Sequence, residues 1–275
     1  MDTRNRLSDD LHVLSGILDR VDEFTLKRFR SDDLVVETKP DMTPVTDADS
    51  GAEKLIRTML GQFRARDAIF GEEQGSQSGF SGRRWIIDPI DGTKNFVRGV
   101  PVWATLVGLE EEGEIVLGMV SAPALKRRWW AVKGMGAFTG KSWASAQQIH
   151  VSRVGRLEDA SFSYSSFGGW HQRGQLRAFM RLAQSVWRTR AYGDFWSYML
   201  VAEGAVDIAA EPDLQLYDMA ALVPIVQEAG GRFTSLDGAD GPWGGNALVS
   251  NGLLHDAARQ VLDSIRDSDP TRDGD

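Results

Sequence analysis

Two aspartates that could share a metal ion stand three residues apart in the segment 88–96, which reads DPIDGTKNF. The segment follows the apolar run 85–87, where a predicted strand ends. Asp-Pro and Asp-Gly are common turn dipeptides, so a plain turn is one interpretation. In a second interpretation, Asp88 and Asp91 project into one cleft. Carboxylates on a short loop are ligands that Mg²⁺ prefers. The segment therefore indicates either a turn or a divalent-cation site.

Two further carboxylates fit the second interpretation. Glu72 follows another short apolar run at 68–70, and Asp218 stands at the start of a predicted helix. Four carboxylates in one cleft would repel each other unless cations neutralised them, and two Mg²⁺ would balance their charge. This pattern of charge is typical of a two-metal site for phosphoryl transfer.

Four ordered motifs resemble those of the inositol monophosphatase family of Mg²⁺-dependent, Li⁺-sensitive sugar-phosphate phosphatases. They are VTDAD at 45–49, GEE at 71–73, the segment 88–96, and DMAA at 218–221 followed by EAGG at 228–231. The resemblance extends from about residue 10 to about residue 262. It implies an α+β fold of mixed α/β layers, namely a five-layered αβαβα sandwich of the sugar-phosphatase type, and a homodimer. It also implies two or three Mg²⁺ per active site, with Mn²⁺ able to substitute and Li⁺ inhibitory.

The resemblance also implies which residues hold the metal ions. Glu72, Asp88 and the main-chain carbonyl of Ile90 would hold one ion. Asp88, Asp91 and Asp218 would hold the second, so that Asp88 bridges the two.

The same resemblance implies the catalytic machinery. Thr93 together with Asp49 would position a metal-activated water that attacks phosphorus directly. The backbone N–H groups of Gly92 and Thr93 would hold the phosphate at the start of a helix. The family often has Trp before the last metal-binding Asp, whereas this chain has Tyr217, a difference that alters packing rather than ligation. The expected catalytic residues are Thr93, Asp49, Glu72 and Asp91.

Three segments, 95–103, 127–130 and 191–195, resemble the histidinol-phosphate phosphatase branch of the family more than its inositol branch. Histidinol phosphate carries an ammonium and an imidazole, so its pocket should present anions. Asp194 follows Gly193 where inositol phosphatases usually have a small polar residue, and Glu211 ends the predicted strand 206–210. L-Histidinol phosphate is therefore the expected substrate. The expected substrate-binding residues are Gly92, Thr93, Gly193, Asp194, Glu211 and Asp218.

Other interpretations stay open. Asp194 could serve only as the N-cap of the helix that follows it, and Glu211 occurs across the family. The enzyme could instead be an inositol-1-monophosphatase or a fructose-1,6-bisphosphatase. A non-catalytic binding or regulatory protein on the same fold is a remote alternative, because the expected metal ligands and Thr93 are all present.

Composition excludes several classes of protein. The chain has 275 residues, 31 Lys and Arg against 39 Asp and Glu, a net charge of -8 and no Cys. Without Cys it can be neither a disulfide scaffold nor a thiolate zinc protein. The acidic balance disfavours nucleic-acid binding, and no apolar run reaches the roughly 18 residues of a membrane span. We therefore expect a cytoplasmic enzyme acting on a small-molecule phosphate monoester.

Hydrophobic periodicity predicts the elements that must position these residues. A helix is expected at 8–29, and a second helix ends at 63 with either Thr46 or Asp49 as its N-cap. Strands are expected at 85–87, 102–109, 115–120 and 129–132. In the second half, strands at 160–164, 206–210 and 247–249 alternate with helices at 193–203, 218–229 and 253–265. We expect a first domain over 1–150, carrying Glu72 and 88–93, and a second over 151–265, carrying Asp194, Glu211 and Asp218. A disordered tail is expected over 266–275.

Overall fold

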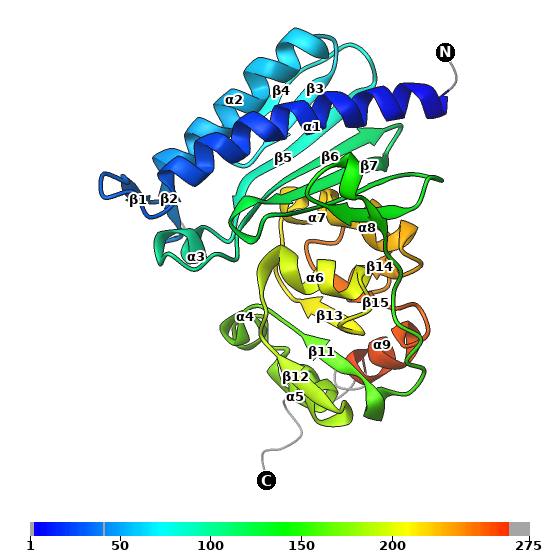
Figure 1. Cartoon of the computed structure of the whole chain (residues 1–275). Helices are drawn as coiled ribbons and strands as arrows, with labels where there is room; N and C mark the ends of the chain where they lie inside the picture. The colour runs from blue at the N-terminus through cyan, green and yellow to red at the C-terminus, as the bar shows by residue number, and fades with distance from the viewer. Residues whose placement is uncertain (1–2, 41, 264–275) are drawn as a thin grey trace. The chain divides into compact units, whose positions relative to one another are not determined.

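The computed structural model describes residues 3–40 and 42–263, and the expected tail at 266–275 lies outside this range. The described residues form mixed helices and sheets, which confirms the predicted class (Figure 1). They divide into two compact units, the first comprising residues up to 149 together with 216–228, and the second comprising 150–215 and the residues from 229 onward. Within the described ranges, no helix combines the length and apolar character needed to cross a membrane.

A mixed sheet forms the framework of the first unit. Among the described residues it has eight strands in the order β10-β9-β8-β7-β6-β5-β3-β4, and neighbours are antiparallel except for β3 and β5. A separate hairpin pairs β1 (Val36–Thr38) with β2 (Pro44–Thr46). The strands of the large sheet are β3 (Ala68–Gly71), β4 (Gly75–Gln77), β5 (Arg83–Asp91), β6 (Ala104–Glu111), β7 (Glu114–Ala122), β8 (Arg127–Val132), β9 (Ala137–Gly140) and β10 (Gln147–Gln148).

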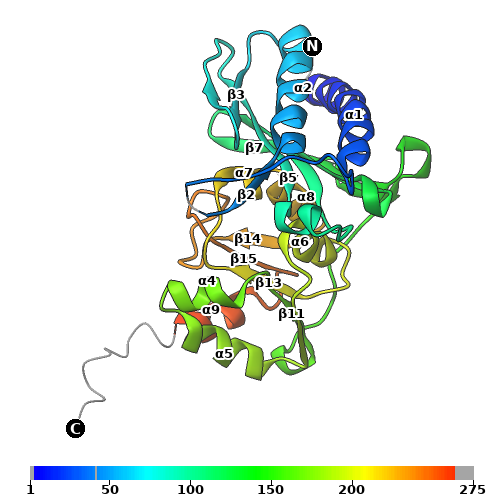
Figure 2. The ribbon, with the colours of Figure 1, turned by 90° about the vertical axis from the view of Figure 1, so that its left-hand side faces the viewer.

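Two long helices cover one face of this sheet (Figure 2). They are α1 (Thr3–Arg28), which begins five residues before the predicted helix, and α2 (Asp47–Phe63), which ends where predicted. The buried residues of α1 recur at three- and four-residue spacing, as a helix facing a core requires. α2 begins after Thr46, whose hydroxyl accepts a hydrogen bond from the Ala48 N–H, while the Thr46 N–H donates to Asp49. This cap therefore places Asp49 in the first turn of α2.

The segment 216–228 differs from the prediction in two ways. It belongs to the first unit, because its helices cover the sheet face opposite α1 and α2. It also forms two short helices, α7 (Leu216–Ala220) and α8 (Leu222–Glu228), instead of the single helix expected at 218–229. Pro224 explains the break, since proline has no N–H and its ring would collide with the carbonyl of Ala220 in a continuous helix. Asp218 is thereby placed in the first unit.

Two glycines in the sheet allow α7 and α8 to approach closely. A Cβ atom added to Gly118 of β7 would lie 2.1 Å from the carbonyl oxygen of Ala221. A Cβ atom added to Gly108 of β6 would lie 3.0 Å from Ala220. Residues on either side of these glycines face the opposite way, into the core beneath α1 and α2. The sheet is thus buried on both faces in this region.

We expect Gly118→Ala to lower the free energy of unfolding by about 1–3 kcal/mol, because the added methyl group overpacks the contact with Ala221. Thermal unfolding should record a fall in Tm of about 2–4 °C per kcal/mol. Gly16→Ala in α1 is the control, since a Cβ there meets no atom within 4 Å. An equal fall in both variants would contradict the close-contact explanation.

The second unit is built on a smaller sheet. Among the described residues it has five strands in the order β12-β11-β13-β15-β14. Helices α4, α5 and α9 cover one face, and α6 lies against the other. The elements are β11 (Ser161–Ser163), α4 (Phe167–Gln172), α5 (Leu176–Ser185), β12 (Arg188–Arg190), α6 (Asp194–Ala202), β13 (Ile208–Glu211), β14 (Arg232–Thr234), β15 (Ala247–Ser250) and α9 (His255–Asp263). A single 3₁₀ turn occurs in this unit at Leu157–Asp159, and two others occur in the first unit, at Pro123–Leu125 and Trp143–Ser145.

A buried histidine makes the stability of this unit sensitive to acid. His255 is fully buried, with Nε2 3.0 Å from the Thr234 hydroxyl and Nδ1 3.1 Å from the Ser250 hydroxyl. Burial, assisted by the charge of Arg232, lowers the pKa of His255 to about 4. In the unfolded chain His255 is therefore protonated as the pH falls below about 6.5, whereas in the folded chain it stays neutral down to about pH 4.

Because the folded pKa is the lower one, stability should fall as the pH drops from about 6.5 toward 4. We expect His255 to account for a loss of roughly 1–2 kcal/mol between pH 7.5 and pH 5. Urea unfolding of the wild type and of His255→Gln at both pH values measures this contribution. The same change at the exposed His171 is the control, and a wild-type pH dependence in His255→Gln would rule the assignment out.

Candidate metal and phosphate site

An irregularity at the end of β5 turns two aspartates to the same side. Residues 88 and 91 are an odd number of positions apart, so a regular strand would point them to opposite faces. Here Asp88 pairs with Leu106 of β6 and Asp91 pairs with Ala104, so two residues of β5 oppose the single Thr105. This bulge accommodates Pro89, whose carbonyl accepts a hydrogen bond of 2.8 Å from the Thr105 hydroxyl. The Asp-Pro segment is thus part of the strand, and not only a turn after it.

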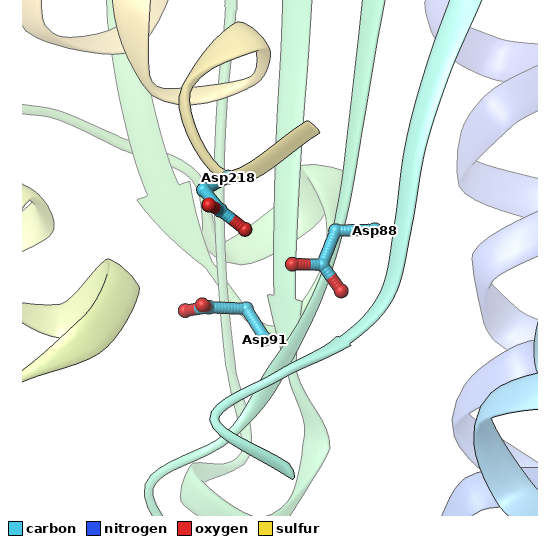
Figure 3. A group of neighbouring side chains, drawn as sticks. All are labelled: Asp88, Asp91 and Asp218. Carbon is cyan, nitrogen blue, oxygen red and sulfur yellow. The ribbon is translucent and has the colours of Figure 1, made fainter. Parts of the chain in front are cut away.

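Asp218 of α7 joins these two aspartates (Figure 3). One carboxylate oxygen from each of Asp88, Asp91 and Asp218 lies within 4.8 Å of the others, which makes them the one such group found in the described ranges. The three carboxylates lie close together and come from β5 and α7 of the same unit. The structure therefore brings together all three residues that were expected at the second metal ion.

The chemistry of this group fits a hard divalent cation. Asp88 is buried, and its Oδ1 has no hydrogen-bond partner among the described residues. Burial raises the pKa of Asp88 well above its usual range, and the charges of Glu72, Asp91 and Asp218 raise it further. An unsatisfied buried carboxylate oxygen among other anions is costly unless a cation pairs with it. The donor set consists of oxygen atoms, as Mg²⁺ requires.

Glu72 lies next to this group without belonging to it. It directly follows β3, and its N–H donates to the carbonyl of Ile87, one residue before Asp88. Its Oε1 accepts a hydrogen bond of 2.7 Å from Lys39, which also donates to Glu73 at 2.8 Å. Burial alone would lower the pKa of Lys39, but these two carboxylates raise it on balance. The part of Glu72 in metal binding stays a prediction.

Sequence patterns had not singled out Lys39. It lies in the turn between β1 and β2, far from Glu72 along the chain, and a lone lysine in a turn looks like any surface lysine. The VTDAD motif that begins six residues later was the only local indication that this turn lies near the site.

The threonine and the aspartate that were expected to position the attacking water contact each other. The Thr93 hydroxyl lies 3.2 Å from Asp49 Oδ1 and 3.0 Å from the carbonyl oxygen of Ile90. Asp49 is fully buried, and its other oxygen accepts hydrogen bonds from the N–H and the hydroxyl of Thr46. Burial raises the pKa of Asp49, although the hydrogen bonds from Thr46 oppose the shift. The arrangement leaves the lone pairs of the Thr93 hydroxyl available as acceptors.

Gly92 begins the short helix that carries Thr93. The residue has φ 85° and precedes α3 (Thr93–Val97). A positive φ is strained for residues with a side chain, so glycine suits the sharp change from β5 to α3. The first N–H groups of a helix have no partner within it, which leaves them able to bind an anion.

The substrate residues predicted from charge lie in the second unit. Asp194 is the first residue of α6 and has φ 49°, a strained conformation for aspartate. Gly193 is the N-cap, so the alternative of Asp194 as N-cap is wrong. The Ser165 hydroxyl donates to Asp194 Oδ1 at 3.2 Å.

Glu211 lies on the sheet face that α6 covers. It ends β13, is buried, and accepts a hydrogen bond of 2.9 Å from the hydroxyl of Tyr198. Tyr198 stands four residues after Asp194, and residues at this spacing share one face of a helix. Both predicted anions of the second unit are therefore associated with α6.

The chain belongs to the inositol monophosphatase family, whose model matches residues 8–267. It is a phosphatase of this family, as predicted. Its curated relatives include the histidinol-phosphatase of Streptomyces coelicolor, which is 60% identical over 90% of this chain and 94% of that protein. The histidinol-phosphatase of Mycobacterium tuberculosis is 56% identical over 90% of this chain and 95% of its own length. Among solved structures, the SuhB protein of Bartonella henselae superposes with a TM-score of 0.85 at 28% identity, covering 92% of this chain and 98% of that one.

Proposed function

We propose that the protein is a Mg²⁺-dependent phosphomonoesterase that hydrolyses L-histidinol phosphate to L-histidinol and phosphate. The observation that carries the chemistry is the group of Asp88, Asp91 and Asp218, with the buried Asp88 Oδ1 lacking a protein partner in the described ranges. The substrate assignment is supported by the two histidinol-phosphatases that are 56% and 60% identical to this chain.

Two divalent cations would be held by the oxygen ligands of the first unit. Asp88 would bridge them, with Glu72 and the Ile90 carbonyl on one side and Asp91 and Asp218 on the other. Bound cations of this kind lower the pKa of water and neutralise the negative charge of the phosphate. Mn²⁺ in place of Mg²⁺, and inhibition by Li⁺, are part of the proposal.

The side chains of Thr93 and Asp49 would place the attacking water. The Thr93 hydroxyl donates to Asp49 and accepts a hydrogen bond from the water, which aims the water oxygen at phosphorus. The new bond joins the water oxygen to phosphorus as the bond from phosphorus to the ester oxygen breaks. The water's proton passes to Thr93 while the Thr93 proton passes to Asp49, and the ester oxygen leaves as the alcohol after taking a proton from solvent. The N–H groups of Gly92 and Thr93 would hold the phosphate oxygens.

The cationic part of the substrate would be recognised by carboxylates of the second unit. Asp194 and Glu211 supply negative charge for an ammonium or imidazolium group, and Gly193 precedes them at the start of α6. The left-handed conformation of Asp194 supports a functional role, because strain of this kind persists where other contacts demand it. A homodimer and a cytoplasmic location stay predictions.

A substrate panel tests the proposal. Phosphate release is measured with histidinol phosphate, inositol 1-phosphate and fructose 1,6-bisphosphate, each with Mg²⁺ and with EDTA. We expect histidinol phosphate to have the highest kcat/KM and EDTA to abolish turnover. A preference for either other compound would replace the substrate assignment, and a covalent phosphoryl-enzyme would overturn direct attack by water.

A further inference from the structure

A second buried carboxylate lies on the same face of α2 as Asp49. Glu53 stands four residues after Asp49, one turn farther along the helix, and its side chain has no exposed surface. Together with Ile56 and Leu60 it follows the spacing of the buried stripe. A carboxylate at such a position needs several hydrogen bonds to offset the loss of water.

The backbone next to Glu72 supplies these hydrogen bonds. Glu53 Oε2 accepts from the N–H of Glu73 at 2.7 Å, and Oε1 accepts from the N–H of Gln74 at 3.1 Å. The carboxylate also sits directly over Gly71, where an added Cβ atom would lie 2.3 Å from Oε1. Glu53 therefore contacts the chain on both sides of Glu72.

Arg57 completes this arrangement one turn farther along α2. Its Nε donates to Glu53 Oε1 at 2.7 Å, and its Nη2 donates to the carbonyl of Gly75 at 2.5 Å. The guanidinium balances the charge of Glu53, which would otherwise add to the repulsion around Asp88. The pair thus holds residues 73–75 without adding net charge.

The backbone of Glu72 is consequently fixed from two directions. Its own N–H is tied to Ile87 of β5, and the two amides that follow are tied to Glu53 of α2. The direction of a side chain follows its backbone, so the position of the Glu72 carboxylate relative to Asp88 depends on both attachments.

We propose that Glu53, supported by Arg57, is a positioning residue that orients Glu72 for metal binding. This inference rests on the proposed function, in which Glu72 is a metal ligand. Groups that orient metal ligands typically contribute a factor of about 10–100 to metal affinity. Glu53 itself does not need to touch the ion.

The test is direct titration of Mg²⁺ into the substrate-free protein by isothermal calorimetry. In Glu53→Gln, the amide NH₂ replaces one acceptor oxygen and faces N–H donors, so the attachment of residues 73–74 is weakened. We expect the Kd for Mg²⁺ to rise about 10-fold or more, while kcat at saturating Mg²⁺ stays within a few-fold of wild type. That combination separates a loss of metal affinity from a loss of chemistry.

Glu228→Gln is the matched control. Glu228 also accepts from two backbone N–H groups of one loop, those of Gly134 and Gly136, each at 2.7 Å. Both variants remove one helix-borne carboxylate oxygen that accepts hydrogen bonds from a loop of the first unit, so both should lower Tm. We expect the Kd for Mg²⁺ to change in Glu53→Gln alone. If Glu53→Gln does not fold, Arg57→Met is titrated in the same way and is expected to weaken Mg²⁺ binding.

The outcomes distinguish this inference from the proposed function. A folded Glu53→Gln protein with the wild-type Kd overturns the positioning role, as does an equal change in Glu228→Gln. If the wild-type protein itself binds no Mg²⁺, the proposed function fails first. A raised Kd in Glu53→Gln with normal turnover at saturating Mg²⁺ supports the positioning role.

Discussion

Asp88→Asn is expected to abolish most of the activity while making the metal-free protein more stable. The carboxylate is proposed to bridge both cations, and its loss should lower kcat by roughly three orders of magnitude or more. In the metal-free protein the same carboxylate has a raised pKa because of burial and neighbouring acids, so it opposes folding at neutral pH. Removing it should raise Tm by about 2–4 °C for each kcal/mol relieved.

Thermal unfolding with and without Mg²⁺, combined with phosphate release, measures both effects. The wild-type Tm should rise with Mg²⁺, as expected when a ligand binds only the folded state, and the Tm of Asp88→Asn should respond far less. Asp10→Asn is the control, since Asp10 is equally buried but accepts from Arg64 and Arg83 at 2.5 Å. That variant should be less stable and still respond to Mg²⁺. A lower Tm in both metal-free variants would contradict the repulsion at Asp88.

Asp194→Asn is expected to weaken turnover of histidinol phosphate selectively. The substitution removes a charge-assisted hydrogen bond to the substrate cation, which is worth roughly 1.5–3 kcal/mol. The corresponding loss in kcat/KM is about 10- to 150-fold. Turnover of a sugar phosphate or an aryl phosphate should change much less, because these compounds carry no cationic group that could contact Asp194.

The comparison depends on measuring both classes of substrate with the same protein preparation. Ser165→Ala is a useful companion variant, because it removes the hydroxyl that donates to Asp194 but keeps the charge. We expect it to have a smaller effect than Asp194→Asn on histidinol phosphate. An equal loss on all substrates would show that Asp194 has a structural role, and cation recognition would then rest on Glu211.

Short motifs with fixed spacing allowed much of the site to be predicted. Asp88, Asp91 and Asp218 were expected at one place, and their oxygens lie within 4.8 Å of each other. Thr46, one of two plausible caps of the second predicted helix, is its N-cap in the structure. These features could be predicted because each depends on local geometry or on a motif that carries its own chemistry.

Features that depend on distant partners could not be predicted in this way. An apolar stripe shows that 216–228 is buried, but it does not show which sheet it covers. Glu53 stands on the buried stripe of α2. A charged residue at such a position indicates a buried partner, but the periodicity of the helix does not show which residue that partner is. The partners of Glu53 at 73–75 are set by the path of the chain after β3, which has no local signature.

The place of residues 216–228 in the first unit has a consequence for how the chain is made. Synthesis proceeds from the N-terminus, so residues 150–215 must emerge from the ribosome before α7 and α8 can dock. Until then, the sheet face at Gly108 and Gly118 has no cover, and the acidic group lacks Asp218. We therefore expect the nascent first unit to expose apolar surface to chaperones. A piece ending at residue 149 should not fold when expressed alone, so for engineering purposes the chain cannot be divided there.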